Sequence, residues 1–105
     1  MPRSPAPEAL LLHVLPLADW ESLGDATHWR PPSLAAQGFV HLCRPEQLAG
    51  VLERWYAGRD DLVVLELAPA GLEATIDWAE LPHGRFPHLL GPLNLSAVTA
   101  VRDPP

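Results

Sequence analysis

The chain has 105 residues, which is room for one domain and one core, because single domains typically run to roughly 100–150 residues. A two-domain enzyme is therefore excluded. Hydrophobic residues make up 48% of the chain, too large a share for wholesale disorder. Thirteen acidic residues against seven arginines give a formal charge of -6. A duplex-binding protein needs a basic face that these few cations cannot build, so we expect no duplex nucleic acid partner.

The sequence indicates a cytoplasmic protein. The one cysteine, Cys43, cannot form an internal disulfide. The longest uncharged run near the start, residues 9–18, is far shorter than the ~20 apolar residues of a membrane span, and no small-residue cleavage site follows it. We expect neither a signal peptide nor a membrane anchor. Residues 9–102 are interpreted as the single domain, with residues 1–8 and 103–105 as tails.

The first third of the chain predicts a strand, a helix and an extended turn. Residues 9–15 are an apolar run closed by a proline, which favours a buried strand. Residues 17–24 predict a short helix, with acidic side chains in its first turns, where the helix dipole favours them. Residues 27–32 must be extended through two prolines, after which Ser33 is placed to cap one helical turn up to Gln37.

The clearest helix of the sequence covers residues 45–57, and Gly58 follows as the C-terminal signal. Its apolar side chains recur at spacings of three and four and predict a buried face made of Leu48, Val51, Leu52, Trp55 and Tyr56. Its weak point is Arg44, which offers no side-chain acceptor at the capping position. Further strands are expected at residues 38–43, 61–67, 74–78, 85–90 and 97–102. Strands that follow one another in this way favour an α+β fold with two or three short helices.

Two histidines lie inside predicted strands. His13 and His41 each stand between apolar residues, and a buried imidazole needs a partner for each ring nitrogen. Each fits a core histidine bonded to the backbone. Each also fits a histidine that binds or polarises a substrate, and two on neighbouring strands favour a shared cleft. With Cys43 or His88 they are also candidates for a metal site, but the paired, tightly spaced ligands typical of zinc are missing, so metal is not expected.

Other side chains are candidates for substrate contacts. Arg85 and His88 lie in a stretch stiffened by prolines, where they could meet a phosphate or carboxylate, or merely cover the core. Trp29 lies beside a turn at Arg30 and is a candidate to stack on a ligand, with Ser33 next to it. The remaining tryptophans are expected in the core. A Cys43 nucleophile is less favoured than a buried, inert thiol. The sequence has no dinucleotide fingerprint, phosphate-binding loop or nucleophile elbow.

The chain resembles the small bacterial and plant proteins grouped as domain of unknown function 952. The resemblance covers about residues 10–102, and its most specific segments are Gly38-Phe39-Val40-His41-Leu42-Cys43 and Phe86-Pro87-His88-Leu89-Leu90-Gly91-Pro92-Leu93. It implies the fold of the ADP-ribosyltransferases, a split antiparallel sheet that frames an NAD cleft. It also implies roles for three residues. His13 would bind a ribose hydroxyl, and His41 would take the place of a tyrosine near nicotinamide, as in the transferases that remove a 2′-phosphate from RNA. Glu80 is the candidate for the glutamate that stabilises the oxocarbenium-like state, although no glutamate matches that role cleanly.

Three functions follow as hypotheses. The first is an NAD-binding or NAD-using protein, with His13, His41 and Glu80 catalytic and with Trp29, Arg30, Ser33, Arg85 and His88 binding a nucleotide-like ligand. The second is a non-catalytic small-ligand or protein-interaction module on the same fold, which the missing glutamate favours. The third is a metal-dependent enzyme that uses His13, His41 and His88.

Overall fold

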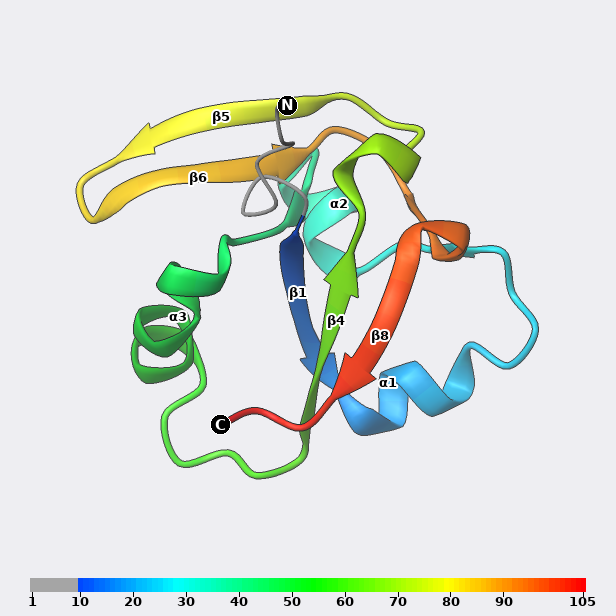
Figure 1. Cartoon of the computed structure of the whole chain (residues 1–105), viewed down its shortest axis with the longest axis horizontal. Coiled ribbons are helices and arrows are strands. Elements are labelled where there is room, and N and C mark those ends of the chain that lie inside the picture. Colours follow the sequence, from blue (N-terminus) through cyan, green and yellow to red (C-terminus); the bar gives the residue numbers. More distant parts are fainter. Residues whose placement is uncertain (1–9) are drawn as a thin grey trace, which may run out of the picture.

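A computed structural model describes residues 10–105, so the expected tail at residues 1–8 and the start of the first strand lie outside the described residues. The strands form three small sheets (Figure 1), and every pairing is antiparallel. The first sheet has the order β1-β4-β8, with β1 at Leu11–Pro16, β4 at Leu62–Leu67 and β8 at Val98–Arg102. The second pairs β2, His28–Trp29, with β7, Leu93–Asn94. The third has the order β3-β6-β5, with β3 at Val40–His41, β6 at Gly84–Leu89 and β5 at Ile76–Leu81.

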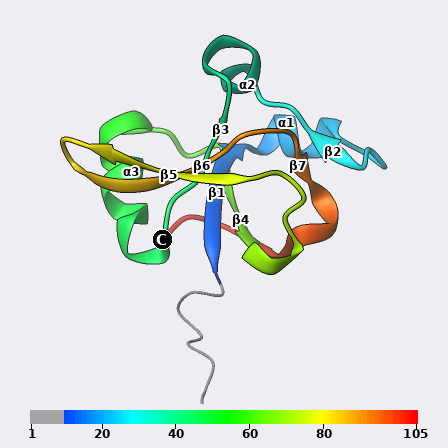
Figure 2. The same cartoon turned by 90° about the horizontal axis from the view of Figure 1, so that it is seen from above.

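The helices are short, and single helical turns separate several strands. They are α1 at Leu17–Ser22, α2 at Pro32–Gln37 and α3 at Leu48–Trp55, with 3-10 turns η2 at Pro45–Gln47, η3 at Pro69–Gly71 and η4 at Leu95–Ala97. Figure 2 shows α3 beside one end of the β5–β6 hairpin and α2 projecting from another side of the molecule. No helix within residues 10–105 is both long enough and apolar enough to cross a membrane. The α+β class with antiparallel sheets and few helices is confirmed.

The core is divided into two clusters by β1. Side chains from alternate positions of a strand point to opposite faces, so Leu11 and Leu15 join one cluster with β4, while Leu12 and Val14 join the other. The second cluster packs against α3 and against Phe86 of the hairpin. The described residues form one compact domain with a radius of gyration of 13.4 Å, close to the ~13 Å typical of 100 residues.

Most predicted elements are present, with corrected ends. The long helix begins with the 3-10 turn η2, where the Oε1 atom of Gln47 accepts the backbone N–H of Arg44 at 2.8 Å. The backbone N–H of Gln47 donates in turn to the Arg44 carbonyl at 2.9 Å, so the turn is closed without a capping acceptor on the Arg44 side chain. The prediction that Ser33 caps α2 is wrong: the N-cap is Pro31, and the Ser33 hydroxyl donates instead to the carbonyl of Phe39 at 2.8 Å. Strand β3 is only two residues long, because Gly38, at φ 91°, still belongs to the end of α2.

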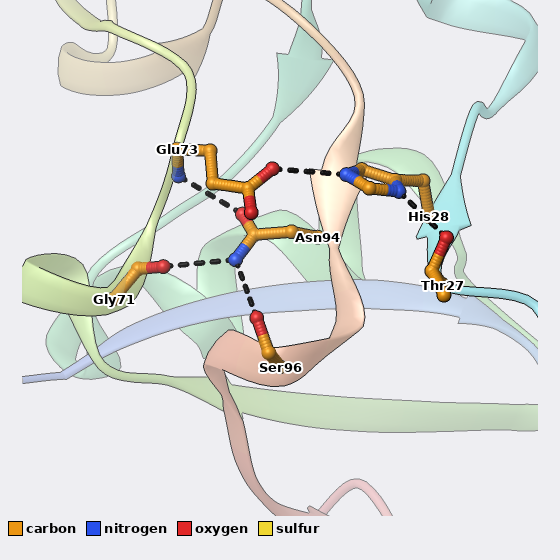
Figure 3. A network of polar contacts seen from close by, with 6 residues as sticks. All are labelled: Thr27, His28, Gly71, Glu73, Asn94 and Ser96. Atoms are coloured by element: carbon orange, nitrogen blue, oxygen red, sulfur yellow. Dashed lines mark hydrogen bonds and ion pairs between the residues drawn. The ribbon is translucent and has the colours of Figure 1, made fainter.

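A polar network holds the small β2–β7 sheet against the loop before β5 (Figure 3). Asn94 is 2% exposed, and its amide donates to the Gly71 carbonyl and to the Ser96 hydroxyl, both at 2.8 Å. Its oxygen accepts the backbone N–H of Glu73 at 3.0 Å, and the Glu73 carboxylate in turn accepts from His28 Nε2 at 2.9 Å. Since every polar atom of this buried amide is paired, the network fixes the position of β7. None of these contacts had been predicted from the sequence.

The backbone of Gly91 lies unusually close to the side chain of Ala74. A Cβ atom at this position would lie 2.9 Å from the Cβ of Ala74, and a methyl group on a short side chain cannot swing away. We expect Gly91→Ala to lower the free energy of unfolding by about 1–3 kcal/mol, the usual cost of overpacking. The measurement is urea denaturation of both proteins.

Gly50 provides the matched control. It lies inside α3, and a Cβ there would only touch the flexible end of Arg54, at 3.8 Å. Gly50→Ala should raise the free energy of unfolding by roughly 0.5–1 kcal/mol, because glycine is a poor helix former. Equal effects of the two substitutions would contradict the close packing of Gly91.

Candidate functional site

The candidate site is a cleft along the free edge of β1. Strand β1 pairs with β4 on one side only, and on the other side the segment that follows β3 contacts it through a single bridge, from Leu12 to Cys43. Beyond that bridge the two segments are no longer paired. The resulting cleft has a volume of about 690 Å³ and is lined by residues 12–16 of β1 together with residues of α1, α2, α3, β3 and the β5–β6 hairpin.

His13 lies in the wall of this cleft with both ring nitrogens bonded to protein groups. Its Nδ1 lies 2.8 Å from the carbonyl oxygen of His41, and the indole N–H of Trp29 donates to its Nε2 at 3.0 Å. A carbonyl only accepts, so Nδ1 carries the proton and the imidazole is neutral. These contacts match the first of the alternatives for His13, a core histidine whose ring is hydrogen-bonded within the protein. They also join β1 to β2 and to β3.

Burial makes this neutral state strongly preferred. His13 is 5% exposed, and desolvation lowers its pKa to about 4, against a smaller opposing effect of the His41 carbonyl. The nearby His41 ring lowers the pKa slightly further. A doubly protonated ring would also point its Nε2 proton at the N–H of Trp29, so the contacts exclude the charged form.

Two further histidines of the cleft, His41 and His88, have free ring atoms. His41 is exposed, and its Nε2 lies 2.9 Å from the amide oxygen of Gln37. His88 is 8% exposed, and its ring stacks on Phe39 with 3.8 Å between centroids. Within residues 10–105 the His88 ring has no hydrogen-bonding partner. Burial lowers the pKa of both rings, and for His41 the neighbouring His88 adds to the effect. Both are therefore neutral groups at pH 7 that can donate or accept.

The backbone of β1 adds a donor and an acceptor. Leu12 exchanges both of its backbone hydrogen bonds with Cys43, at 2.7 and 2.9 Å, so its N–H and C=O point away from β4. Backbone groups two residues apart on a strand point the same way, so those of Val14 also point to the free edge. No strand among the described residues pairs with that edge at Val14. Its N–H and C=O therefore face the cleft side by side.

The structure brings together five of the eight predicted site residues. The cleft is lined by His13, Trp29, Ser33, His41 and His88, although the Ser33 hydroxyl already bonds to Phe39. Glu80, Arg85 and Arg30 are exposed and are not among the lining residues. Glu80 and Arg85 face each other across the β5–β6 pair at 3.4 Å.

Several lining residues had not been predicted as functional. They come from four elements: Asp19, Gln37, Trp55, Tyr56 and His83. The prediction of a buried Trp55 is wrong, since 65% of it is exposed, and that of a core Trp78 is wrong because 37% of it is exposed. The helical spacing that placed Trp55 on the apolar face of α3 was correct, but at the end of the helix this face borders the cleft and not the core. No sequence pattern marks Asp19 or the Val14 backbone.

Cys43 is a buried thiol, and burial raises its pKa to about 12. A thiolate at this position is strongly disfavoured, so the geometry matches an inert core cysteine. Within residues 10–105, no three histidine, cysteine, aspartate or glutamate side chains are grouped to hold a metal ion.

The fold and the cleft together define a small α+β domain with a cavity at the edge of a sheet, lined mainly by side chains. A family model described as "Protein of unknown function (DUF952)" matches residues 14–101. The chain belongs to this family, which confirms that part of the resemblance.

Solved structures of a family relative support the fold. The crystal structure of protein CC0527 from Caulobacter crescentus is 31% identical in sequence, with a TM-score of 0.80 over 90% of this chain and 84% of that chain. The solution NMR structure of CC0527 gives a TM-score of 0.75 at 31% identity, over 90% of this chain and 83% of that chain. A search of curated proteins found no match.

The lowered pKa of His13 predicts how stability depends on pH. The folded state binds fewer protons at His13 than the unfolded chain between pH 6.5 and about pH 4. The free energy of unfolding should therefore fall as the pH drops through this window, by about 3 kcal/mol from this residue alone. In His13→Gln this part of the pH dependence should vanish.

Urea denaturation of both proteins at pH 7, 6, 5 and 4 measures this effect. His41 and His88, whose pKa values are also lowered, are present in both proteins, so the difference between the two curves isolates His13. Parallel curves would contradict a neutral, buried His13.

Proposed function

We propose that this protein binds a small heteroaromatic molecule that carries an amide-like pair of one donor and one acceptor. The observation that carries the proposal is that the N–H and C=O of Val14, on the free edge of β1, have no backbone partner among residues 10–105. A carboxamide, or the edge of a purine or pyrimidine, presents the complementary pair and would extend the sheet by one rung, in the manner of an added strand.

The walls of the cleft suit a flat ring. Aromatic side chains from distant parts of the chain line it, namely Trp29, Phe39, Trp55, Tyr56 and Phe86. Such a lining with a few convergent polar groups is typical of small-molecule sites. The ring nitrogen of His88 is buried and lacks a protein partner among residues 10–105, and a buried polar group without a partner costs about 1–3 kcal/mol. A ligand that bonds to His88 would recover part of this cost.

Binding is favoured over catalysis by the position of the carboxylates. Glu80, the candidate for the catalytic glutamate, is exposed, lies beside Arg85 and is not among the lining residues. Both nitrogens of His13 are bonded within the protein, so His13 would have to give up a partner to meet a ribose hydroxyl. These contacts support the binding module as the first candidate.

An NAD-using transferase with the ADP-ribosyltransferase fold is the second candidate. It is favoured by one observation, the presence of His13 and His41 in the same cleft, which is the arrangement implied for the two strand positions. The nicotinamide carboxamide of NAD also has the donor and acceptor that Val14 would bind. Release of nicotinamide from NAD is the reaction that would identify this activity.

Nicotinamide and nicotinic acid test the proposal as a matched pair, because they differ only in the amide. On titration with nicotinamide, the backbone amide resonance of Val14 should shift in ¹⁵N-HSQC spectra, while that of Leu12, already bonded to Cys43, should move much less. Nicotinic acid has no N–H donor and carries a negative charge, and it should bind at least tenfold more weakly.

The variant His88→Phe keeps the stacking on Phe39 but removes the ring nitrogens. It should weaken nicotinamide binding about threefold to tenfold, as expected for one hydrogen bond worth roughly 0.5–1.5 kcal/mol. If nicotinamide leaves the Val14 resonance unmoved at 20 mM, or if both ligands bind equally, the proposed function is wrong.

A further inference from the structure

We infer that the ligand is an organic cation without phosphate groups, held in the part of the cleft that is lined by Asp19 of α1 and Trp55 at the end of α3. This inference rests on the proposed function, since it names the class of ligand for the same cleft. It is carried by three features of the lining, which are its formal charges, its aromatic rings and the end of α3.

The formal charge of the lining is negative. Asp19 is the one carboxylate among the lining residues, and no arginine is among them, while the whole chain has no lysine. The histidines of the wall with lowered pKa values are neutral at pH 7. Phosphate recognition depends on arginine, lysine or the backbone amides of a helix N-terminus, and the described lining has neither cation. The N-terminus of α2 lines the cleft, but its N-cap and first residue are Pro31 and Pro32, which have no N–H, and the N–H of Leu34 donates to the Pro31 carbonyl.

The arginine beside the end of α3 is already paired. Arg59 donates to both oxygens of Asp61, at 2.9 and 2.6 Å, and its side chain lies over the Tyr56 ring at 5.9 Å. The N–H of Leu17, the first residue of α1, donates to the carbonyl of Asp61 at 2.7 Å, which places Asp19 at the same end of the molecule. Asp19, Arg59 and Asp61 together therefore have a net charge of about -1 at pH 7.

Two aromatic residues end α3 at this point. Trp55 is its last residue and Tyr56 its C-cap, and both line the cleft. The C-terminus of a helix has a partial negative charge, which attracts cations. The face of a tryptophan or tyrosine ring also attracts cations. With 65% of its surface exposed, Trp55 has room for a ligand that lies against it.

A carboxylate, the exposed Trp55 ring and a helix C-terminus in the lining of one cleft favour a positively charged ring or a quaternary ammonium group. The Tyr56 ring already lies under Arg59 and is left out of this set. The amide-like pair would bind at Val14 and the positive charge would lie towards Asp19. A dinucleotide would bring two phosphate charges into the same negative lining, and its binding should be disfavoured.

A pair of ligands that are isosteric in size but differ in charge and in the position of one methyl group tests the inference. The cation 1-methylnicotinamide and the neutral 6-methylnicotinamide have the same heavy atoms and the same carboxamide. Isothermal titration calorimetry of the full chain at pH 8 and 20 mM salt should show that the cation binds about tenfold more tightly. NAD should bind more weakly than the cation. The preference for the cation should decrease at 500 mM salt, because salt screens partly exposed charges.

Asp19→Asn and Trp55→Leu should each reduce the preference for the cation to about threefold or less. Glu21→Gln is the matched control for the carboxylate, because it removes the same charge from α1 outside the lining. Trp78→Leu is the control for the ring, since Trp78 lies on β5 under Arg85 and outside the lining. Both controls should keep the tenfold preference.

The outcomes separate the two proposals. If both methylnicotinamides bind with equal affinity, or NAD binds more tightly than either, the proposed function stands and the inference of a cation is overturned. If Glu21→Gln reduces the preference as much as Asp19→Asn, the effect is one of net charge alone and the site at α1 and α3 is wrong. If neither ligand binds at 20 mM, the proposed function itself is overturned.

Discussion

The neutral imidazole of His13 is the contact on which the three sheets depend. One ring nitrogen donates to the carbonyl of His41 on β3, and the other accepts the indole N–H of Trp29 on β2. The ring itself stands on β1, so one side chain joins all three sheets. The sheets have three, two and three strands, and a sheet of two strands is marginally stable at best without further packing. Their mutual position therefore depends on packing and on this pair of hydrogen bonds.

The cleft lies along the edge of β1, the strand that carries His13. Because the segment after β3 pairs with β1 only at Leu12, through Cys43, the rest of this edge of β1 has no partner strand among residues 10–105. A sheet edge is normally paired, covered or charged. Here it forms the wall of a cavity, and α2 and α3 supply residues on its other sides. The same contact that holds the molecule together thus leaves the backbone of Val14 open to a ligand.

The sequence predicts those elements whose pattern is local. Strands β1 and β4 are continuous apolar runs, and the first turns of α3 follow a clear helical period, so their positions could be predicted within a few residues. The pairs β2–β7 and β3–β6 involve two residues of β2, β7 and β3, which is too short for any periodicity. Their pairing depends on contacts between distant segments, such as the polar network of Asn94.

Part of the site was also predictable, because some of its residues lie in segments with a clear local pattern. Clustering of histidines in apolar strands indicated that His13 and His41 share a region, and the cleft contains both. Their roles could not be decided from the sequence, because the partners of His13 lie 16 and 28 residues away. The Val14 edge has no side-chain signal, since it depends on which strand is missing beside it. The position of Glu80 depends on the β5–β6 register, which pairs it with Arg85.

The protonation state of His13 is the most direct test of this account. The measurement is a long-range ¹H–¹⁵N NMR spectrum of the histidine side chains, recorded from pH 8 to pH 5. The account predicts that His13 has its proton on Nδ1 throughout and does not titrate, because its pKa is about 4. A proton on Nε2, or titration of His13 with a pKa near 6.5, would show that the His13 ring does not join the three sheets.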